Sequence, residues 1–471
     1  MSRENSRRAV RGLASPLRRP KGFLTGPPGQ RYTGSTVRRS GRVGRRRAGM
    51  MREKKAMGGE GLSFLGEVVP EVRPYRWVML GLLWSLYASF GLISRAIFPL
   101  VTPLLRDLAL TYTQMGVVLG SWQLTYILAA LAAGTVLDRW GVKRCLLAGA
   151  VLMSLSAGFR FFALGFWSLL AAVAMFGAGG PMISIGGPKT IAAWFAGQGR
   201  GTAMGLYMAG PAVGGLLSLS LTNSLVMPCL GQSWRLTFVF YGLVALGAGG
   251  LWWFLSRETE GTGAGGEAGL GKIFGRLIRV RNVRLILLMA LASFAVSHGF
   301  TSWLPKILEV SGLSPAKAGL AAAVPVATGA LALVVIPRLV PASRRGRVIA
   351  VLALLTLIFL LVVSRASGGW LLLGLAGLGV TESALLPLML LILMDSPEVG
   401  SRHMGAAGGM YFTVAEMGGF TGPLIMGLLV DATGAFLAGV GFLAGLCLAV
   451  SALTLLLRRE GASAAAGAEN E

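Results

Sequence analysis

The chain has 471 residues, of which 54% are hydrophobic and only 13% charged, and its mean hydropathy is +0.68. This composition excludes an ordinary soluble domain, in which roughly a quarter of the residues are charged. Its three cysteines are scattered and its two histidines lie far apart, so we expect no disulfide framework, no metal site and no cofactor.

Residues 1–75 form a basic segment rich in glycine and proline. Up to Arg76 the chain holds 19 lysines and arginines against 5 acidic residues, and the formal net charge of the whole chain is +25. Such a segment is predicted to be disordered and could lie as a polybasic arm on anionic lipid. The alternatives are a solvated tail or translation from a later start at Met50, Met51 or Met57. We expect no signal peptide here and no nucleic-acid binding, because neither the placement of aromatic residues nor a motif supports it.

Twelve apolar stretches follow this tail, each long enough to cross a bilayer as a helix. The hydrocarbon core of a bilayer is about 30 Å thick and needs roughly 20 residues per helix. The sequence therefore predicts an all-α integral membrane protein with twelve transmembrane helices. The predicted spans are 77–104, 114–137, 145–163, 166–190, 201–226, 234–255, 285–308, 316–338, 347–363, 370–394, 405–430 and 434–457.

The distribution of positive charge predicts the orientation of these spans. Without the tail, the connections on the side of the two termini carry 17 lysines and arginines, and the connections on the opposite side carry 6. Positively charged loops stay in the cytoplasm. We therefore expect a multi-pass protein of the cell membrane with both termini in the cytoplasm.

A polar, glycine-rich connection from Ser256 to Arg284 divides the spans six and six, as a linker between two bundles would. We therefore predict bundles at 76–255 and 285–457, a linker at 256–284 and a C-terminal tail at 458–471. The two bundles are predicted to be pseudo-symmetric, because Gly201-Thr-Ala-Met-Gly-Leu-Tyr207 is echoed 204 residues later by Gly405-Ala-Ala-Gly-Gly-Met-Tyr411. Tyr207 and Tyr411 are candidate substrate-binding residues, with core packing as the alternative.

The loop between spans two and three carries the sharpest motif, Gly134-Thr-Val-Leu-Asp138-Arg139-Trp-Gly141-Val-Lys143-Arg144. It resembles the G-x-x-x-D-R-x-G-x-R/K-R loop of the major facilitator superfamily, in the position where that family places it. The start of span five, Arg200-Gly201-Thr-Ala203-Met-Gly205 after Trp194-Phe195, is similar to a second family pattern. The resemblance covers about residues 76–457 and implies transport by alternating access between two six-helix bundles.

The resemblance also implies a gate in this loop. In the family, the aspartate at the end of the second helix acts with a basic network and the N-terminus of the eleventh helix to hold the cytoplasmic side shut. A carboxylate at the C-terminal end of a helix is unfavourable unless such partners offset it. Anchoring by positive charge would explain the basic residues of the loop as well, but not its aspartate. The predicted gating residues are Gly134, Asp138, Arg139, Gly141, Lys143 and Arg144.

Four ionisable residues fall at membrane depth, where a charge costs roughly 2.5–3.5 kcal/mol or more; they are Arg95, His298, Glu382 and Glu416. In the family, helices one, four, seven and ten face a central cavity, so Arg95, His298 and Glu382 are candidate substrate-binding residues. A guanidinium in that cavity would bind a carboxylate through two hydrogen bonds. Its alternative role is to snorkel to the outer interface.

Glu382 and Glu416 are the candidates for proton coupling, because each could bind and release a proton inside the membrane. For either residue the alternative is a structural ion pair or a hydrogen bond to a neighbouring helix. His298 could also exchange a proton or serve as a packed hydrogen-bonding group. Lys189, near the cytoplasmic end of span four, is interpreted as snorkelling.

Two further runs resemble the anion:cation symporter branch of the family and its cyanate- and nitrate-type porters. They are Arg95-Ala-Ile-Phe-Pro99 and Pro188-Lys189-Thr-Ile-Ala-Ala-Trp194-Phe195. The chain departs from that branch at Ser94, where the branch usually has an aspartate.

The leading functional hypothesis is a proton-linked symporter of a small organic anion. The second is a proton-driven exporter of hydrophobic or cationic compounds on the same fold, which would need an acidic, aromatic cavity. A polytopic membrane enzyme and a channel are less favoured, since neither clustered catalytic groups nor a repeated filter loop is apparent. The expected partners are a small-molecule substrate, protons and the lipid bilayer, and the protein is expected to be a monomer.

Overall fold

The computed structural model describes residues 72–195, 198–257, 275–396 and 399–457. The described residues form helices and loops without a β-strand. The long helices are α2 (Val72–Ala96), α4 (Tyr112–Trp140), α5 (Val142–Arg160), α6 (Phe166–Trp194), α7 (Gln198–Leu221), α9 (Trp234–Leu255), α11 (Arg281–Val310), α12 (Pro315–Leu339), α13 (Arg345–Arg365), α14 (Gly368–Asp395), α15 (Gly400–Thr433) and α16 (Phe436–Leu455). Short elements between them are η1 (Phe98–Leu100), α3 (Val101–Asp107), η2 (Thr222–Val226), α8 (Met227–Cys229) and η3 (Ala342–Arg344).

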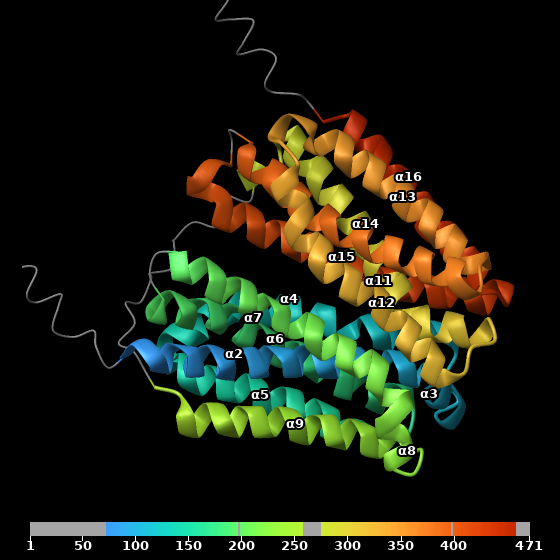
Figure 1. Cartoon of the computed structure of the whole chain (residues 1–471), viewed down its shortest axis with the longest axis horizontal. Helices are drawn as coiled ribbons and strands as arrows, with labels where there is room; N and C mark the ends of the chain where they lie inside the picture. Colours follow the sequence, from blue (N-terminus) through green and yellow to red (C-terminus); the bar gives the residue numbers. More distant parts are fainter. Residues whose placement is uncertain (1–71, 196–197, 258–274, 397–398, 458–471) are drawn as a thin grey trace, which may run out of the picture. The chain divides into compact units, whose positions relative to one another are not determined.

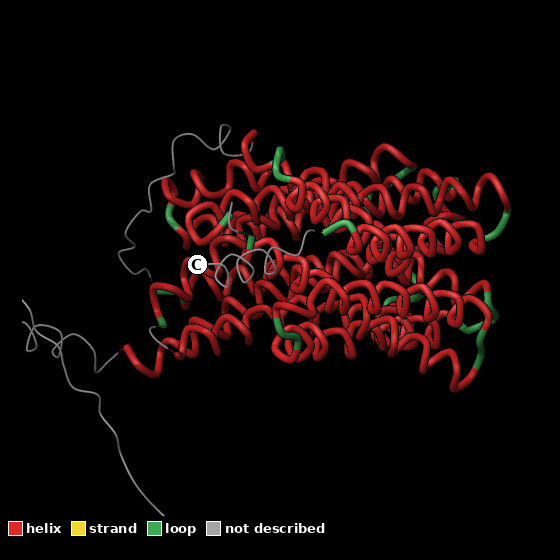
Figure 2. The backbone as a smooth tube through the Cα atoms, turned by 90° about the horizontal axis from the view of Figure 1, so that it is seen from above, coloured by secondary structure: helices red, strands yellow, loops and turns green. Residues whose placement is uncertain are grey.

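Twelve helices among the described residues are long and apolar enough to cross a membrane, which confirms the predicted number. Figure 2 shows them running side by side, with short loops at both ends. The first of these spans extends to Asp107, because η1 and α3 continue α2 almost without interruption. We call the end where α2 begins and α4 ends the N-terminal face, and the opposite end, where α4 begins, the distal face.

The helices divide into two halves of equivalent packing. In the N half (α2–α9), α2 packs on α7, α4 on α6, and α5 on α6 and α9. In the C half (α11–α16), α11 packs on α15, α12 on α14, and α13 on α14 and α16. Figure 1 shows the N half from blue to green and the C half from yellow to red. The fold is therefore all-α, with two pseudo-symmetric six-helix bundles.

The internal repeat is visible in individual contacts. A Cβ atom added at Gly214 would lie 1.9 Å from the carbonyl oxygen of Ala88, and one added at Gly418 would lie 2.0 Å from that of Leu291. These two glycines, 204 residues apart, thus let α7 and α15 touch the backbones of α2 and α11. Small residues give transmembrane helices such close approaches. The echo in the sequence therefore corresponds to a repeated helix junction.

The duplicated tyrosines, Tyr207 and Tyr411, also make equivalent hydrogen bonds in the two halves. The Tyr207 hydroxyl donates to the carbonyl oxygen of Ile183 at 2.7 Å, and the Tyr411 hydroxyl donates to that of Leu386 at 3.3 Å. Both tyrosine side chains are 0% exposed. Each hydroxyl satisfies a backbone oxygen of a neighbouring helix, which favours the packing alternative for both residues.

The halves meet along two pairs of helices, α4 with α15 and α7 with α12. Among the described residues, the hydrogen bonds that join the two halves lie at the centre and toward the distal face. There, Thr102 on α3 donates to Glu309 on α11 and accepts from Lys306 Nζ at 3.0 Å. Asn223 donates to the carbonyl oxygen of Pro315 at 3.4 Å. The distal face is therefore closed in this structure.

The predicted bundle boundaries at 76, 255, 285 and 457 stay predictions. The first 71 residues of the basic tail, residues 258–274 of the predicted linker and the C-terminal tail from 458 onward lie outside the described residues.

Candidate substrate site and gate

The ionisable residues that the sequence placed inside the membrane come together where the halves meet. Arg95 on α2 interacts electrostatically with Glu382 on α14 and with His298 on α11. Glu416 on α15 interacts with the tyrosines on the facing helices, among them Tyr87 on α2. All of these residues are half-buried although they lie within spans, so the cluster borders a space that other residues do not fill.

Arg95 has a free hydrogen-bonding surface. Its aliphatic chain packs over Gly215 on α7, since a Cβ atom there would lie 2.4 Å from Arg95 Cδ. Among the described residues its guanidinium forms no hydrogen bond and no ion pair. A fixed cation in a low-dielectric site attracts an anion strongly, and the planar guanidinium fits a carboxylate with two parallel bonds.

Gln123 on α4 joins the halves at the level of this cluster. Its Nε2 donates to His298 Nδ1 at 3.0 Å and to the carbonyl oxygen of Gly419 at 3.3 Å. Because the amide donates, the imidazole accepts at Nδ1, and its own N–H stays on Nε2. Sequence reasoning did not find Gln123, since an uncharged amide within a span gives a weaker signal than a charge.

Three buried oxygen atoms at this level have no hydrogen-bond partner among the described residues: Gln123 Oε1, Glu382 Oε1 and Glu416 Oε2. The Ser297 hydroxyl lies next to the Glu382 carboxyl. Buried acceptors are normally satisfied. These oxygens can therefore accept hydrogen bonds from hydroxyl groups or water, and the two carboxylates can also bind a proton.

Aromatic rings form the N-half wall beside the cluster. Tyr87 stacks on Tyr207 with ring centroids 4.5 Å apart, and Phe90 stacks on Phe176 at 4.9 Å. Trp122 packs edge-on to Phe90 at 5.8 Å. The cluster thus combines one guanidinium, two carboxyl groups and an aromatic surface.

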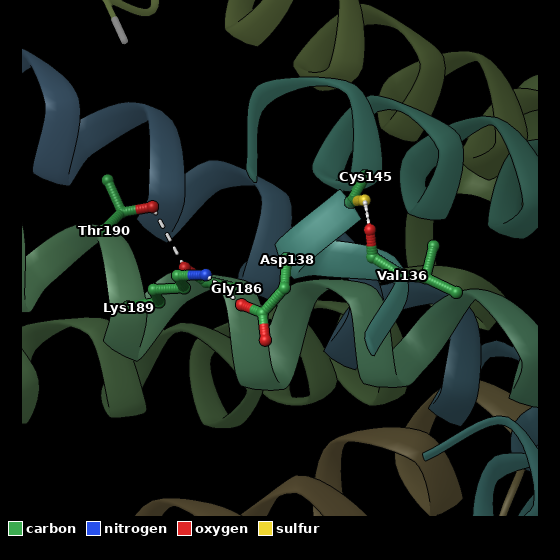
Figure 3. Close-up of polar contacts among 6 residues, drawn as sticks. All are labelled: Val136, Asp138, Cys145, Gly186, Lys189 and Thr190. Carbon is green, nitrogen blue, oxygen red and sulfur yellow. Dashed lines mark hydrogen bonds and ion pairs between the residues drawn. The ribbon is translucent and has the colours of Figure 1, made fainter. Parts of the chain in front are cut away.

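The predicted gating loop lies at the N-terminal face. Asp138, at the end of α4, pairs with Lys189 Nζ at 2.5 Å (Figure 3). Lys189 is on α6, where Thr190 donates back to the carbonyl oxygen of Gly186 at 3.0 Å. The sequence alone had suggested that Lys189 snorkels. It could not show the pairing with Asp138, because the two residues are 51 positions apart in the chain.

The other loop residues surround this ion pair. Gly141 adopts φ 80°, a conformation that favours glycine and turns the chain from α4 into α5. Lys143 Nζ donates to the carbonyl oxygen of Ser256 at 2.9 Å, which attaches the loop to the end of α9. Arg139 and Arg144 are exposed, as anchoring residues would be. Gly134 lies in open space, since a Cβ atom added there would meet no atom within 4 Å. Together with Lys189 the loop lines a cavity of 490 Å³.

Residues 83–421 match the Major Facilitator Superfamily. The chain is 26% identical to the hexuronate transporter of Bacillus subtilis (strain 168), over 75% of this chain and 87% of that protein. It is 24% identical to a putative tartrate transporter of Agrobacterium vitis, over 75% of this chain and 84% of that protein. It is also 24% identical to the probable galactarate/D-glucarate transporter GudP of Bacillus subtilis (strain 168), over 81% and 91%.

Solved structures agree on the fold. An inward-facing bacterial homologue of the human lysosomal transporter Spinster superposes with a TM-score of 0.63 at 17% identity, covering 81% of this chain and 95% of that one. The transporter FucP in its outward conformation gives a TM-score of 0.55 at 17% identity, covering 81% and 99%. The family match spans more than half of the chain, and the chain therefore belongs to the Major Facilitator Superfamily of membrane transporters.

Proposed function

We propose that this protein is a proton-coupled transporter of a small, hydroxylated organic anion, such as a sugar acid. The observation that carries the proposal is the guanidinium of the half-buried Arg95, which has no hydrogen bond or ion pair among the described residues and lies where the halves meet. The names of the relatives, which include hexuronate, tartrate and galactarate transporters, support the same class of substrate.

In this proposal the substrate bridges the two halves. Its carboxylate binds Arg95 on the N half, and its hydroxyl groups donate to the unpaired oxygens of Gln123 and Glu416. The His298 Nε2–H adds a donor from the C half, since Nδ1 is occupied by Gln123. A ligand that is held by both halves follows them as they rock, as alternating access requires.

Proton coupling would use Glu382. Glu382 interacts electrostatically with Arg95. When Glu382 is ionised, its negative charge therefore weakens the attraction between Arg95 and the substrate carboxylate. A proton on Glu382 removes this negative charge, so proton and anion bind together. Glu416 is the second candidate, since it also has a buried oxygen without a partner.

The excess of positive charge in the loops of the N-terminal face supports a cytoplasmic location for that face and for both termini. With the distal face closed, the site would then communicate with the cytoplasm. We propose that the monomer is the transporting unit, because the cluster is assembled within a single chain.

Uptake into proteoliposomes tests the proposal. Purified protein should take up labelled glucuronate faster under an inward proton gradient, and a protonophore should abolish the stimulation. An uncharged sugar of the same size is the matched control and should neither enter nor compete. Uptake that ignores the protonophore would contradict proton coupling, and equal competition by the uncharged sugar would contradict the role of the carboxylate.

One observation favours the exporter hypothesis instead. Glu416 interacts electrostatically with Tyr87 and Tyr126, and a carboxyl group beside aromatic rings is typical of a site for hydrophobic cations. The same vesicles distinguish the two functions. An exporter would move an organic cation in the direction opposite to proton flow and would not transport glucuronate. The enzyme hypothesis is set aside, because members of this family are transporters and not enzymes.

A further inference from the structure

The N-terminus of α4 is capped partly from within its own helix. The first N–H groups of a helix have no partner in the helix and need acceptors. The Gln114 N–H donates to Thr111 Oγ1 at 3.1 Å, and the Thr111 N–H donates to Gln114 Oε1 at 3.1 Å. This capping box satisfies two of the donors, and it leaves the N–H groups of Tyr112 and Thr113.

An aspartate from the other half takes those two donors. The Tyr112 N–H donates to Asp431 Oδ1 at 3.0 Å, and the Thr113 N–H donates to Asp431 Oδ2 at 2.7 Å. The Thr113 hydroxyl adds a third bond to Oδ2 at 2.6 Å. Asp431 lies in the last turn of α15, where its charge is unfavourable for its own helix. The N-terminus of α4 offsets that charge across the junction of the halves.

Asp138 lies at the opposite end of the α4–α15 pair, near the C-terminal end of α4, as Asp431 lies near the C-terminal end of α15. The helices α4 and α15 run antiparallel, so Asp138 in the last turns of α4 and the start of α15 both belong to the N-terminal face. The N-cap residue of α15 is Val399, whose side chain cannot accept a hydrogen bond. In this structure Asp138 is engaged by Lys189 within the N half.

We propose that Asp431 is the latch of the distal face and that it alternates with Asp138 during transport. Asp431 caps α4 while the distal face is closed, as here, and releases it when the halves separate at that face. Asp138 then leaves Lys189 and caps α15 at the N-terminal face, as the loop motif implies. Each aspartate closes one face by capping the partner helix, so the two caps exclude each other. This inference rests on the proposed alternating access.

Cysteine labelling in detergent, without substrate, tests the latch. Leu219 on α7 is 0% exposed and its carbonyl oxygen abuts α12 at Gly319, across the distal junction. A Leu219→Cys reporter is placed in a Cys229→Ser background, because Cys229 is exposed while the other two cysteines are buried. The measured quantity is the rate of reaction with a maleimide.

Asp431→Asn should raise that rate about three- to tenfold, because hydrogen bonds to a charged group are replaced by weaker neutral ones. Asp107→Asn is the matched control: Asp107 is also at the distal face and accepts from Trp234 Nε1 at 2.9 Å, but both residues belong to the N half. It should leave the rate unchanged. Asp138→Asn removes the opposite latch and should leave the rate at or below that of the parent.

A rate for Asp431→Asn no higher than for Asp107→Asn would overturn the proposal. If Asp431→Asn does not yield folded protein, Thr113→Val decides: it removes one bond to Asp431 and should raise the rate about twofold, and an unchanged rate would equally overturn the latch. Because no substrate is present, the labelling result does not depend on glucuronate uptake. Failure of uptake would not contradict the latch, and an unchanged labelling rate would not contradict the proposed substrate.

Discussion

The two halves of this transporter share a scaffold and differ in chemistry. Their helix junctions repeat at Gly214 and Gly418, yet the N half contributes a guanidinium to the centre and the C half contributes two carboxyl groups. Arg95 and His298 lie 203 residues apart, as Ala88 and Leu291 do at the repeated junction, so they occupy equivalent positions. Packing positions were retained between the halves, while positions that face the central space diverged.

The largest expected effect is at Arg95, one of the central positions that differ between the two halves. Arg95→Ala should weaken binding of glucuronate by about 100-fold or more, because a bidentate, charge-assisted pair is lost. Arg95→Lys, which keeps the charge but not the planar fork, should recover part of the affinity. Binding is measured by isothermal titration on purified protein. An unchanged affinity in both variants would mean that Arg95 only anchors its helix.

Glu382→Gln should abolish the stimulation of uptake by a proton gradient while sparing exchange of internal for external substrate. The amide keeps the shape of the side chain but cannot carry a proton. The measurement compares gradient-driven uptake with counterflow in the same vesicles. Glu416→Gln is the paired variant, and it assigns coupling to Glu416 instead if only that variant loses the stimulation.

Substitutions in the shared scaffold should affect both halves alike. Gly214→Val and Gly418→Val should each destabilise the protein by about 1–3 kcal/mol or more, since a side chain would collide with a backbone carbonyl. The midpoint of thermal unfolding in detergent reports this. Gly205→Val is the control, because a Cβ there meets nothing within 4 Å. Strong destabilisation at only one of the two junctions would argue against structural equivalence.

The smallest effects are expected at the duplicated tyrosines. Tyr207→Phe and Tyr411→Phe each remove a hydrogen bond to a backbone oxygen, which should lower stability by about 1 kcal/mol. Affinity for glucuronate should stay within about twofold of the parent. A tenfold loss of affinity in either variant would instead return that tyrosine to the substrate site.

Much of the fold could be predicted because lipid imposes simple constraints. Backbone groups in a bilayer must be satisfied within a helix or a closed barrel, and continuous apolar stretches of about 20 residues fit helices. The repeat at Gly201 and Gly405 indicated duplication. The charged members of the cluster stood out for the same reason, since charges such as Arg95 are rare at membrane depth. The spans and these residues follow from local composition.

The partners in the site could not be predicted in the same way. Gln123 and Lys189 are unremarkable in the sequence, and their importance arises from His298 and Asp138, which lie on other helices. Asp431 looks like an ordinary charged residue at the end of a span. Its role depends on which helix N-terminus lies opposite, and that is a property of packing.

The sequence by itself determined that this protein crosses the membrane twelve times, that its two halves are repeats and that it carries the loop of the Major Facilitator Superfamily. Each of these is encoded in short stretches, through hydropathy or local motif. Only the tertiary structure decided that Arg95 interacts electrostatically with Glu382 and His298 and that Asp431 caps α4, because those interactions join residues from different halves. The helices are specified locally, whereas the central cluster and the cap on α4 are specified by how the halves pack.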